Sequence, residues 1–297
     1  MVFARFGALP YGASLLKAFE PGKEFLFMVT KAIQSIRYAL LEGHAAARLS
    51  GYWFSSWRLR VDFLLSRLLK AGLTPGVDQP RQIRFQDWRL TYRFNRGDIQ
   101  SLREVLVEEV YACELPFVPR SILDLGANIG LASLWLARRY QQAEDMCILA
   151  VEASDANARV AAINFRDNAI PGEVIHAAVG EHHGEAFFAA RAASNVGRIV
   201  SSADEASVRV PVIGIAELVA RFPSGQVDLV KMDIEGSERE LLTPRSDWLD
   251  RVRALMIEWH DDVVPSEAMK QVLIERGFHH EPLNAHRQEN LSLYLRR

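Results

Sequence analysis

The stretch ILDLGANIGLASLWLA, residues 122–137, decides the fold. An apolar run closes around Asp124, a turn carries Gly126 and Gly130 four residues apart, and an apolar helical pattern follows. Glycine permits a positive φ and lets another group approach the backbone without meeting a Cβ. A strand that ends in such a turn and continues as a helix indicates a doubly wound α/β sheet, in which ligands bind beyond the carboxyl ends of the strands.

Further strand-like runs alternate with helical ones after residue 119. They are SILDL, CILAVE, EVIHAAV, VDLVKMD and ALMIEW, separated by helical stretches such as DANARVAAINFRDN and SEAMKQVLIERG. Near-continuous apolar strands between helices indicate a parallel sheet that helices cover on both faces. The final runs, FHHEPL and NLSLYLRR, are expected to add an antiparallel pair at one edge. We therefore predict an α/β fold over residues 119–297: a doubly wound, mostly parallel sheet with antiparallel C-terminal edge strands.

The N-terminal part of the chain has a different composition. From Met1 to Lys70 there are ten Lys or Arg against four Asp or Glu, and residues 57–69 carry apolar side chains at helical spacing. We predict a basic helical extension over residues 1–73, then a linker, a short hairpin and a helix over residues 74–118.

An aromatic run in this extension suggests a contact surface. GYWFSSW, residues 51–57, lies among Arg48, Arg58 and Arg60. That mixture suits a membrane headgroup interface or an acceptor cleft, although a helical core face is the commoner explanation. Residues 1–72 are therefore expected to shape the acceptor site, to form a homodimer contact or to touch a membrane surface.

The overall composition excludes several classes of protein. The formal net charge is −2, whereas a general nucleic-acid binder is usually strongly basic. Two cysteines, Cys113 and Cys147, cannot form a disulfide framework and lack the spacing of metal ligands. We expect neither a secretion signal nor a membrane-spanning segment, and we expect a cytoplasmic protein.

The glycine turn narrows the choice of ligand. A dinucleotide site has the fingerprint G-x-G-x-x-G, and Asn128 stands in place of its middle glycine, where the pyrophosphate would touch the backbone. A nucleoside without phosphates would tolerate this turn better. Glu152 closes the second strand, where its carboxylate can accept hydrogen bonds from both ribose hydroxyls. S-adenosylmethionine has the ribose, the ammonium and the sulfonium that suit acidic groups here, and we predict it as the cofactor.

A second motif places ionisable groups beside that turn. VDLVKMDIEGSEREL carries Lys231 and Asp233 on one side of a strand end, with Glu235 close behind. The next strand, ALMIEWH, ends with Glu258 and His260 two residues apart. Because carboxyl ends of neighbouring parallel strands meet at one edge of the sheet, these groups are expected to converge where a reacting centre would lie.

LDLGANIG, the Glu152 position, AAVG and above all KMDIEGSE together resemble the FkbM-type S-adenosylmethionine-dependent methyltransferases, a family of the Rossmann-like class I methyltransferases. The resemblance covers roughly residues 92–297, including RFNRGDIQSLREVLVEEVY, and implies O-methylation of a small molecule, sugar or glycan. Ala153 stands where the family usually has proline. The cofactor-binding residues implied are Asp98, Asp124, Gly126, Ala127, Asn128, Gly130, Glu152, Ala153, Ala178, Val179 and Asp233.

The reaction requires an acceptor hydroxyl to be held in line with the methyl group and relieved of its proton. We rank His260 first as the base, because its ordinary pKa is about 6.5 and Glu258 or Asp233 could orient it. Lys231 could act only if burial lowered its pKa. The other interpretation is structural: Lys231 and Asp233 form an ion pair that fixes the turn, and His260 caps the next segment.

Two further features are left open by the sequence. Asp233, Asp261 and Asp262 could supply oxygen ligands to Mg²⁺, but we expect no metal. The segment FFAARAASNVGRIVSSADE is expected to form an insertion over the pocket, with Asn195 and Arg198 near the acceptor.

Two other functions compete with this interpretation. A nucleic-acid methyltransferase acting on exocyclic amines would have [DNS]-P-P-[YF] where this chain has DIEG, and cytosine C5 chemistry would need a nearby cysteine. We therefore expect a small-molecule or carbohydrate acceptor and no nucleic-acid partner. A non-catalytic Rossmann-like binding or scaffold protein is the second rival, but it would be expected to have lost Asp124, Gly126, Glu152 or Asp233, and all are present.

Overall fold

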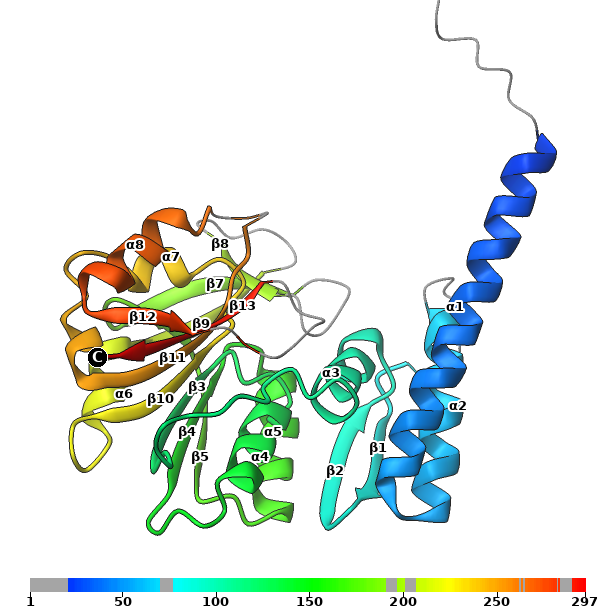
Figure 1. The fold of residues 1–297 in the computed structure, drawn as a ribbon, viewed down its shortest axis with the longest axis horizontal. Helices are drawn as coiled ribbons and strands as arrows, with labels where there is room; N and C mark the ends of the chain where they lie inside the picture. The colour runs from blue at the N-terminus through cyan, green and yellow to red at the C-terminus, as the bar shows by residue number, and fades with distance from the viewer. Residues whose placement is uncertain are drawn as a thin grey trace, which may run out of the picture.

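The computed structural model describes residues 21–69, 77–190, 197–200, 207–261, 263, 265–281, 283 and 290–297. Its centre is a seven-stranded sheet in the order β12-β13-β11-β10-β3-β4-β5 (Figure 1). The strands are β3 (Ser121–Leu125), β4 (Cys147–Glu152), β5 (Gly172–His176), β10 (Val227–Met232), β11 (Val252–Glu258), β12 (Phe278–Glu281) and β13 (Leu291–Arg296).

The strand directions confirm the predicted fold class. β11, β10, β3, β4 and β5 are mutually parallel, and Lys231 of β10 lies in register with Asp124 of β3. β13 pairs antiparallel with β11, and β12 pairs antiparallel with β13. The carboxyl ends of β3, β4, β10 and β11 therefore lie along one edge of the sheet, which is where the predicted functional residues fall.

Helices cover both faces of this sheet, as the apolar strands require. Alternate strand residues such as Ile122 and Met256 pack into a core shared with α4 (Leu131–Arg139) and α5 (Asp155–Asp167). Their neighbours, such as Leu123 and Leu255, face a second core. That core includes residues from α6 (Ile215–Ala220), α7 (Glu238–Leu241), the 3₁₀ helix η1 (Asp247–Arg251) and α8 (Glu267–Glu275).

A smaller sheet is inserted after β5. It contains β6 (Ala178–Gly180), β7 (Gly184–Ala190), β8 (Gly197–Val200) and β9 (Ser207–Gly214), in the order β6-β9-β7-β8. The sequence predicted one strand for EVIHAAV, but this run is divided at Ala177 between the two sheets. Arg198 lies on β8, and Asn195 lies outside the described residues.

The segment before the core forms a helical pair and a hairpin. These elements are α1 (Pro21–Ser50), α2 (Trp53–Leu69), β1 (Pro80–Phe85), β2 (Trp88–Arg93) and α3 (Arg96–Leu106). The described part of the chain contains no helix with the length and apolar character needed to cross a membrane.

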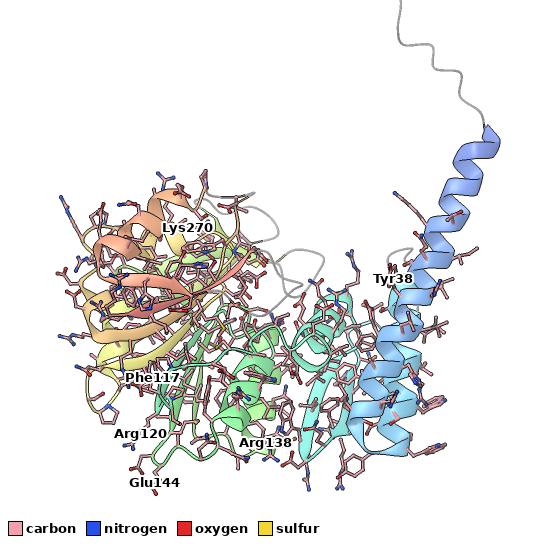
Figure 2. The ribbon with its side chains drawn as sticks, in the orientation of Figure 1. Tyr38, Phe117, Arg120, Arg138, Glu144 and Lys270 are labelled. Atoms are coloured by element: carbon pink, nitrogen blue, oxygen red, sulfur yellow. The ribbon has the colours of Figure 1, made fainter. Side chains whose placement is uncertain are left out.

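Hydrogen bonds attach the β1–β2 hairpin to the core. Asn164 of α5 accepts from the N–H of Thr91 at 2.8 Å and donates to its carbonyl at 3.0 Å. Arg138, at the end of α4 (Figure 2), forms an ion pair with Asp87 in the hairpin turn. Buried Asp62 of α2 in turn accepts from the Tyr92 hydroxyl at 2.5 Å. The hairpin thus joins α2 to the α/β core.

Candidate active site

The glycine turn after β3 is closed by the backbone of two neighbouring strands. Gly126 has a φ of 75°, and a Cβ there would lie 1.7 Å from the carbonyl oxygen of Asp233. The N–H groups of Gly126 and Ala127 both donate to the carbonyl of Val151, each at 3.0 Å. The close approach that the glycine permits is therefore made by the protein's own backbone, and Gly126 also lines the pocket.

Glu152 lies at the centre of the part of the site that the sequence predicted to bind the cofactor. Its carboxylate accepts from the N–H of Asn128 at 2.8 Å, the N–H of Ser154 at 2.9 Å and the amide of Asn157 at 3.4 Å. A carboxylate has about four acceptor positions. Three donors already use it, so about one position is left for a ligand. Burial raises the pKa of Glu152 despite these bonds.

Asn128 supplies an acceptor of its own. The residue has a φ of 50°, and its amide donates to the Ser101 hydroxyl at 2.8 Å. Its Oδ1 is buried without a hydrogen-bond donor among the described residues, although the side chain lines the pocket. A buried unpaired acceptor is costly, and an amino group of a bound nucleoside would satisfy it.

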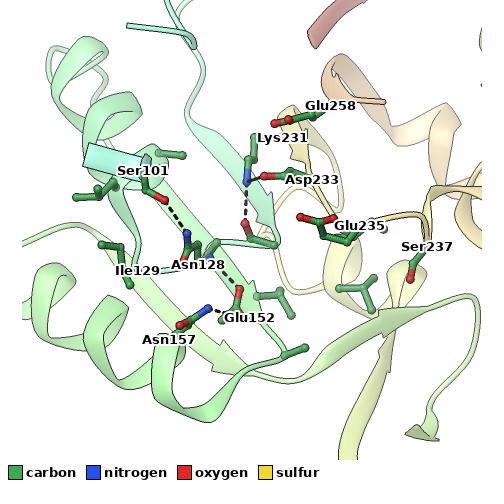
Figure 3. A pocket seen from close by; sticks show the side chains of 18 of the residues that line it. Ser101, Asn128, Ile129, Glu152, Asn157, Lys231, Asp233, Glu235, Ser237 and Glu258 are labelled. Carbon is green, nitrogen blue, oxygen red and sulfur yellow. Dashed lines mark hydrogen bonds and ion pairs between the residues drawn. The ribbon is translucent and has the colours of Figure 1, made fainter. Parts of the chain in front are cut away.

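Lys231 is a buried cation that connects the two halves of the site. Its Nζ lies 3.6 Å from Asp233 (Figure 3). It also lies 2.8 Å from the carbonyl oxygen of Gly126 and 3.2 Å from Asp124. Burial would lower the pKa of Lys231, but the charge of Asp124, with Tyr111 and Asp233, raises it well above the usual value. The raised pKa does not favour Lys231 as the base considered from the sequence, and its contacts are those of an ion-pair partner that fixes the turn.

His260 lies in a cage of carboxylates. Its Nδ1 is 3.1 Å from Glu238, and its Nε2 is 3.6 Å from both Asp233 and Glu235. Burial would lower the pKa of His260, but the hydrogen bond to Glu238 and the charges of Asp233 and Glu235 raise it to about 9. The imidazole is thus protonated at neutral pH. The sequence-based ranking of His260 as the base assumed the ordinary pKa of histidine, and the raised pKa favours an ion-pair role instead.

Glu258 is a carboxyl group of this cluster whose pKa is raised. Burial, followed by the negative charge of Asp233, raises the pKa of Glu258 to about 8. Its Oε1 accepts from the amide of Asn290 at 3.0 Å. Glu258 and Asp233 both line the pocket, so the two carboxyl groups face the same space.

The cofactor half and the ionisable half share one cavity of about 290 Å³. Ala127, Ala153, Ala178 and Val179 line it, as the resemblance implied. The sequence did not single out several other lining residues. These are Gln100, Ser101, Glu104 and Val105 of α3, Tyr111, Asn157, and Phe188 of the inserted sheet.

Three residues expected to bind the cofactor do not line this cavity. Gly130, with a φ of 79°, brings α4 against α5, and a Cβ there would lie 3.2 Å from that of Ala161. Asp124 is fully buried between Lys231 and the Ser133 hydroxyl, which donates to it at 2.6 Å. Gly130 and Asp124 therefore stabilise the structure around the cavity without lining it.

Asp98 is the third of these residues. It is fully buried, and it accepts from the backbone N–H of Arg93 at 2.7 Å and from its guanidinium at 2.8 Å. The N–H of Asp98 in turn donates to Asn95, the N-cap of α3. Asp98 therefore fixes the start of α3, the helix that carries Ser101 to the pocket.

Among the residues that the structure describes, one group could hold a metal ion. Donor atoms of Asp233, Glu235 and His260 all lie within 4.8 Å of one another. The set considered from the sequence was different: Asp261 is exposed and accepts from the N–H of Ser266 at 2.7 Å, and Asp262 lies outside the described residues. The protonated His260 already places a positive charge among these carboxylates.

A doubly wound sheet with a glycine turn after β3, Glu152 at the end of β4 and an ionisable cluster at its carboxyl edge is the arrangement expected of a Rossmann-like class I methyltransferase. Comparison with known families agrees: the Methyltransferase FkbM domain matches residues 124–280, more than half of the chain. The chain belongs to the FkbM methyltransferase family, and its cofactor is S-adenosylmethionine.

Solved structures with a similar arrangement are distant in sequence. The FkbM methyltransferase from Methylobacillus flagellatus is 13% identical with a TM-score of 0.42, and the match covers 91% of this chain. This chain spans 60% of the length of that protein. An O-methyltransferase from Bacillus cereus in complex with SAH is 14% identical with a TM-score of 0.35, over 59% of this chain and 73% of that one. Among curated protein sequences, no relative matches the chain.

Proposed function

We propose that the protein transfers the methyl group of S-adenosylmethionine to a hydroxyl group of a small molecule, sugar or glycan. The observation that carries the proposal is the shared cavity, which joins the Glu152 cradle to Asp233, Glu235, Glu258 and His260. Carboxylates are good acceptors for hydroxyl hydrogens, so this half of the cavity suits a hydroxylated acceptor.

S-adenosylmethionine, when bound, supplies an activated methyl group on a sulfonium. The acceptor hydroxyl would take this methyl group, S-adenosylhomocysteine would leave, and the hydroxyl proton would pass to a base of the protein. We assign that role to Glu258, because a pKa of about 8 is close to the working pH and favours proton transfer. The cationic His260 holds Asp233 and Glu235 in place beside it.

The two cysteines give no support to carbon methylation through a cysteine adduct. Cys113 is buried outside the pocket, and burial raises its pKa to about 11, so it is a thiol rather than a nucleophilic thiolate. Cys147, at the start of β4, also lies outside the pocket-lining residues. Transfer to oxygen therefore fits the site better than chemistry that needs a cysteine adduct.

The test is to incubate the protein with S-adenosylmethionine labelled with ¹³C in its methyl group and with pools of sugars, glycosides and hydroxylated aglycones. The label is expected in an O-methyl group, which carbon NMR distinguishes from an N-methyl or C-methyl group. Label found only on nitrogen or carbon would overturn the assignment. A variant that should behave like the native protein in this assay is Glu185→Gln, because the change lies at an exposed site on β7.

A further inference from the structure

The corner where α1 turns into α2 exposes four aromatic side chains. Tyr52, Trp53, Phe54 and Trp57, here called the aromatic corner, are 40%, 83%, 54% and 52% exposed. Large aromatic side chains bury much apolar surface when a partner is available, and a group of them left in water marks an interaction site. The residues that line the active-site cavity all come later in the sequence, from Gln100 onward, so the aromatic corner is not part of that cavity.

Serine side chains occupy the interior of this corner. Ser50 and Ser55 are buried, and the Ser50 and Ser56 hydroxyls lie 2.7 Å apart. Ser56 also donates to the carbonyl of Ala47 at 2.7 Å, and Ser55 accepts from the N–H of Arg84 at 2.9 Å. The corner is therefore held by polar contacts while its aromatic rings point outward, so GYWFSSW is not the core face that its composition suggested.

Two arginines lie against the aromatic corner. The guanidinium of Arg58 lies 5.2 Å from the ring centre of Phe54, and that of Arg84 lies 5.7 Å from the ring centre of Tyr52. Residues 43–61 contain Arg48, Arg58 and Arg60 and no Asp or Glu. Asp87, in the adjoining hairpin turn, is paired with Arg138. The partner that fits this surface has an apolar region that can receive the aromatic rings and negatively charged groups that can pair with the arginines.

We propose that the aromatic corner binds the surface of an anionic lipid bilayer. Trp and Tyr rings favour the boundary between headgroups and acyl chains, and arginines beside them can reach lipid phosphates. A second copy of the chain fits less well, because a two-fold contact through this corner would bring each cluster of arginines against its own copy. The bilayer supplies the opposite charge that the arginines lack.

The experiment is flotation of the full chain with vesicles of phosphatidylcholine and phosphatidylglycerol in equal parts, compared with phosphatidylcholine alone. Binding is expected to the anionic vesicles and to weaken with added salt. Trp53→Ser combined with Trp57→Ser should lower the partition coefficient at least tenfold. Arg58→Gln and Arg84→Gln should each lower it roughly fivefold on anionic vesicles.

The control is Ile274→Ser, which removes an apolar side chain that is 56% exposed on α8 and should not change flotation. Binding of S-adenosylhomocysteine, measured on every variant, shows that the core is folded and tests the cofactor site separately. Failure of the native chain to float with anionic vesicles overturns the proposal. Equal flotation of the double tryptophan variant, or a dimer that this variant dissociates without any vesicle binding, overturns it too.

Discussion

The carbonyl oxygen of Asp233 occupies the space beside Gly126 where a side chain would begin, since a Cβ on Gly126 would lie 1.7 Å from it. Two bonds reinforce this contact: the N–H of Asp233 donates to the carbonyl of Leu125 at 3.0 Å, and Lys231 donates to that of Gly126 at 2.8 Å. The glycine turn and the ionisable cluster are therefore joined by direct backbone contacts. A substitution in the glycine turn should therefore alter the geometry of the ionisable cluster, and a substitution in the cluster should alter the turn.

Gly126→Ala should weaken both folding and cofactor binding. The left-handed φ of residue 126 would be strained, and the new Cβ must displace the strand end at Asp233, so we expect a loss of about 2–4 kcal/mol in unfolding free energy. Chemical denaturation and titration calorimetry with S-adenosylhomocysteine measure the two effects. Gly184→Ala, where a Cβ meets no atom within 4 Å, is the matched control and should change neither.

Glu152→Gln should weaken cofactor binding with little change in side-chain volume. The amide nitrogen of glutamine would face N–H donors that the carboxylate now accepts from Asn128, Ser154 and Asn157. Loss of a charged hydrogen bond costs about 1.5–3 kcal/mol, so affinity for S-adenosylhomocysteine should fall at least about tenfold. Calorimetry checks this, and an unchanged affinity would show that Glu152 only supports the turn.

Lys231→Met should destabilise the fold more than Lys231→Met combined with Asp124→Asn. The single change leaves the fully buried carboxylate of Asp124 without its cation, which typically costs about 3–5 kcal/mol. In the double variant this buried carboxylate is gone, and the amide oxygen that replaces it can still accept from the Ser133 hydroxyl. Urea unfolding of both variants measures the difference, and equal losses would contradict a charge-pair role.

The sheet could be predicted from the sequence because its strands are apolar on both faces and end at clear turns. The inserted sheet could not, because EVIHAAV gives no signal at Ala177 of a change from one sheet to another. The aromatic corner shows a similar limit. Apolar composition favours burial, but only the hydrogen bonds of Ser50 and Ser56 decide that the serines face inward.

The sequence predicted which side chains meet in the site, but it did not predict their protonation states. Strand ends bring Asp233 and Glu258 together because parallel strands share one carboxyl edge. The charge on His260 depends on Glu238. That residue lies on α7, after the end of β10, and the sequence gives no strand-end signal for it. Ser101 has a signal that can be used: it is one turn from Glu104 on α3, so both reach the pocket from one helix face.

Chelation is expected to leave activity unchanged. Asp233, Glu235 and His260 are close enough to hold a metal ion, but protonated His260 already offsets the carboxylate charge at neutral pH. Methyl transfer should therefore proceed equally after treatment with EDTA and with added Mg²⁺. A loss of activity on chelation that Mg²⁺ restores would contradict this expectation and assign the three residues as ligands.

The pH dependence of methyl transfer should identify the base. Glu258 must lose its proton to accept one, so its raised pKa makes activity increase with pH until about pH 8. The positive charge of the bound cofactor favours the carboxylate, and the limb measured at saturating cofactor should lie at or below that pH. In Glu258→Gln, turnover should fall by about 10²-fold or more and this limb should disappear, while affinity for S-adenosylhomocysteine stays within a few fold. Asp261→Asn, an exposed change outside the pocket, should keep the limb. If the limb persists in Glu258→Gln and is lost in His260→Asn, the proton passes to the imidazole instead.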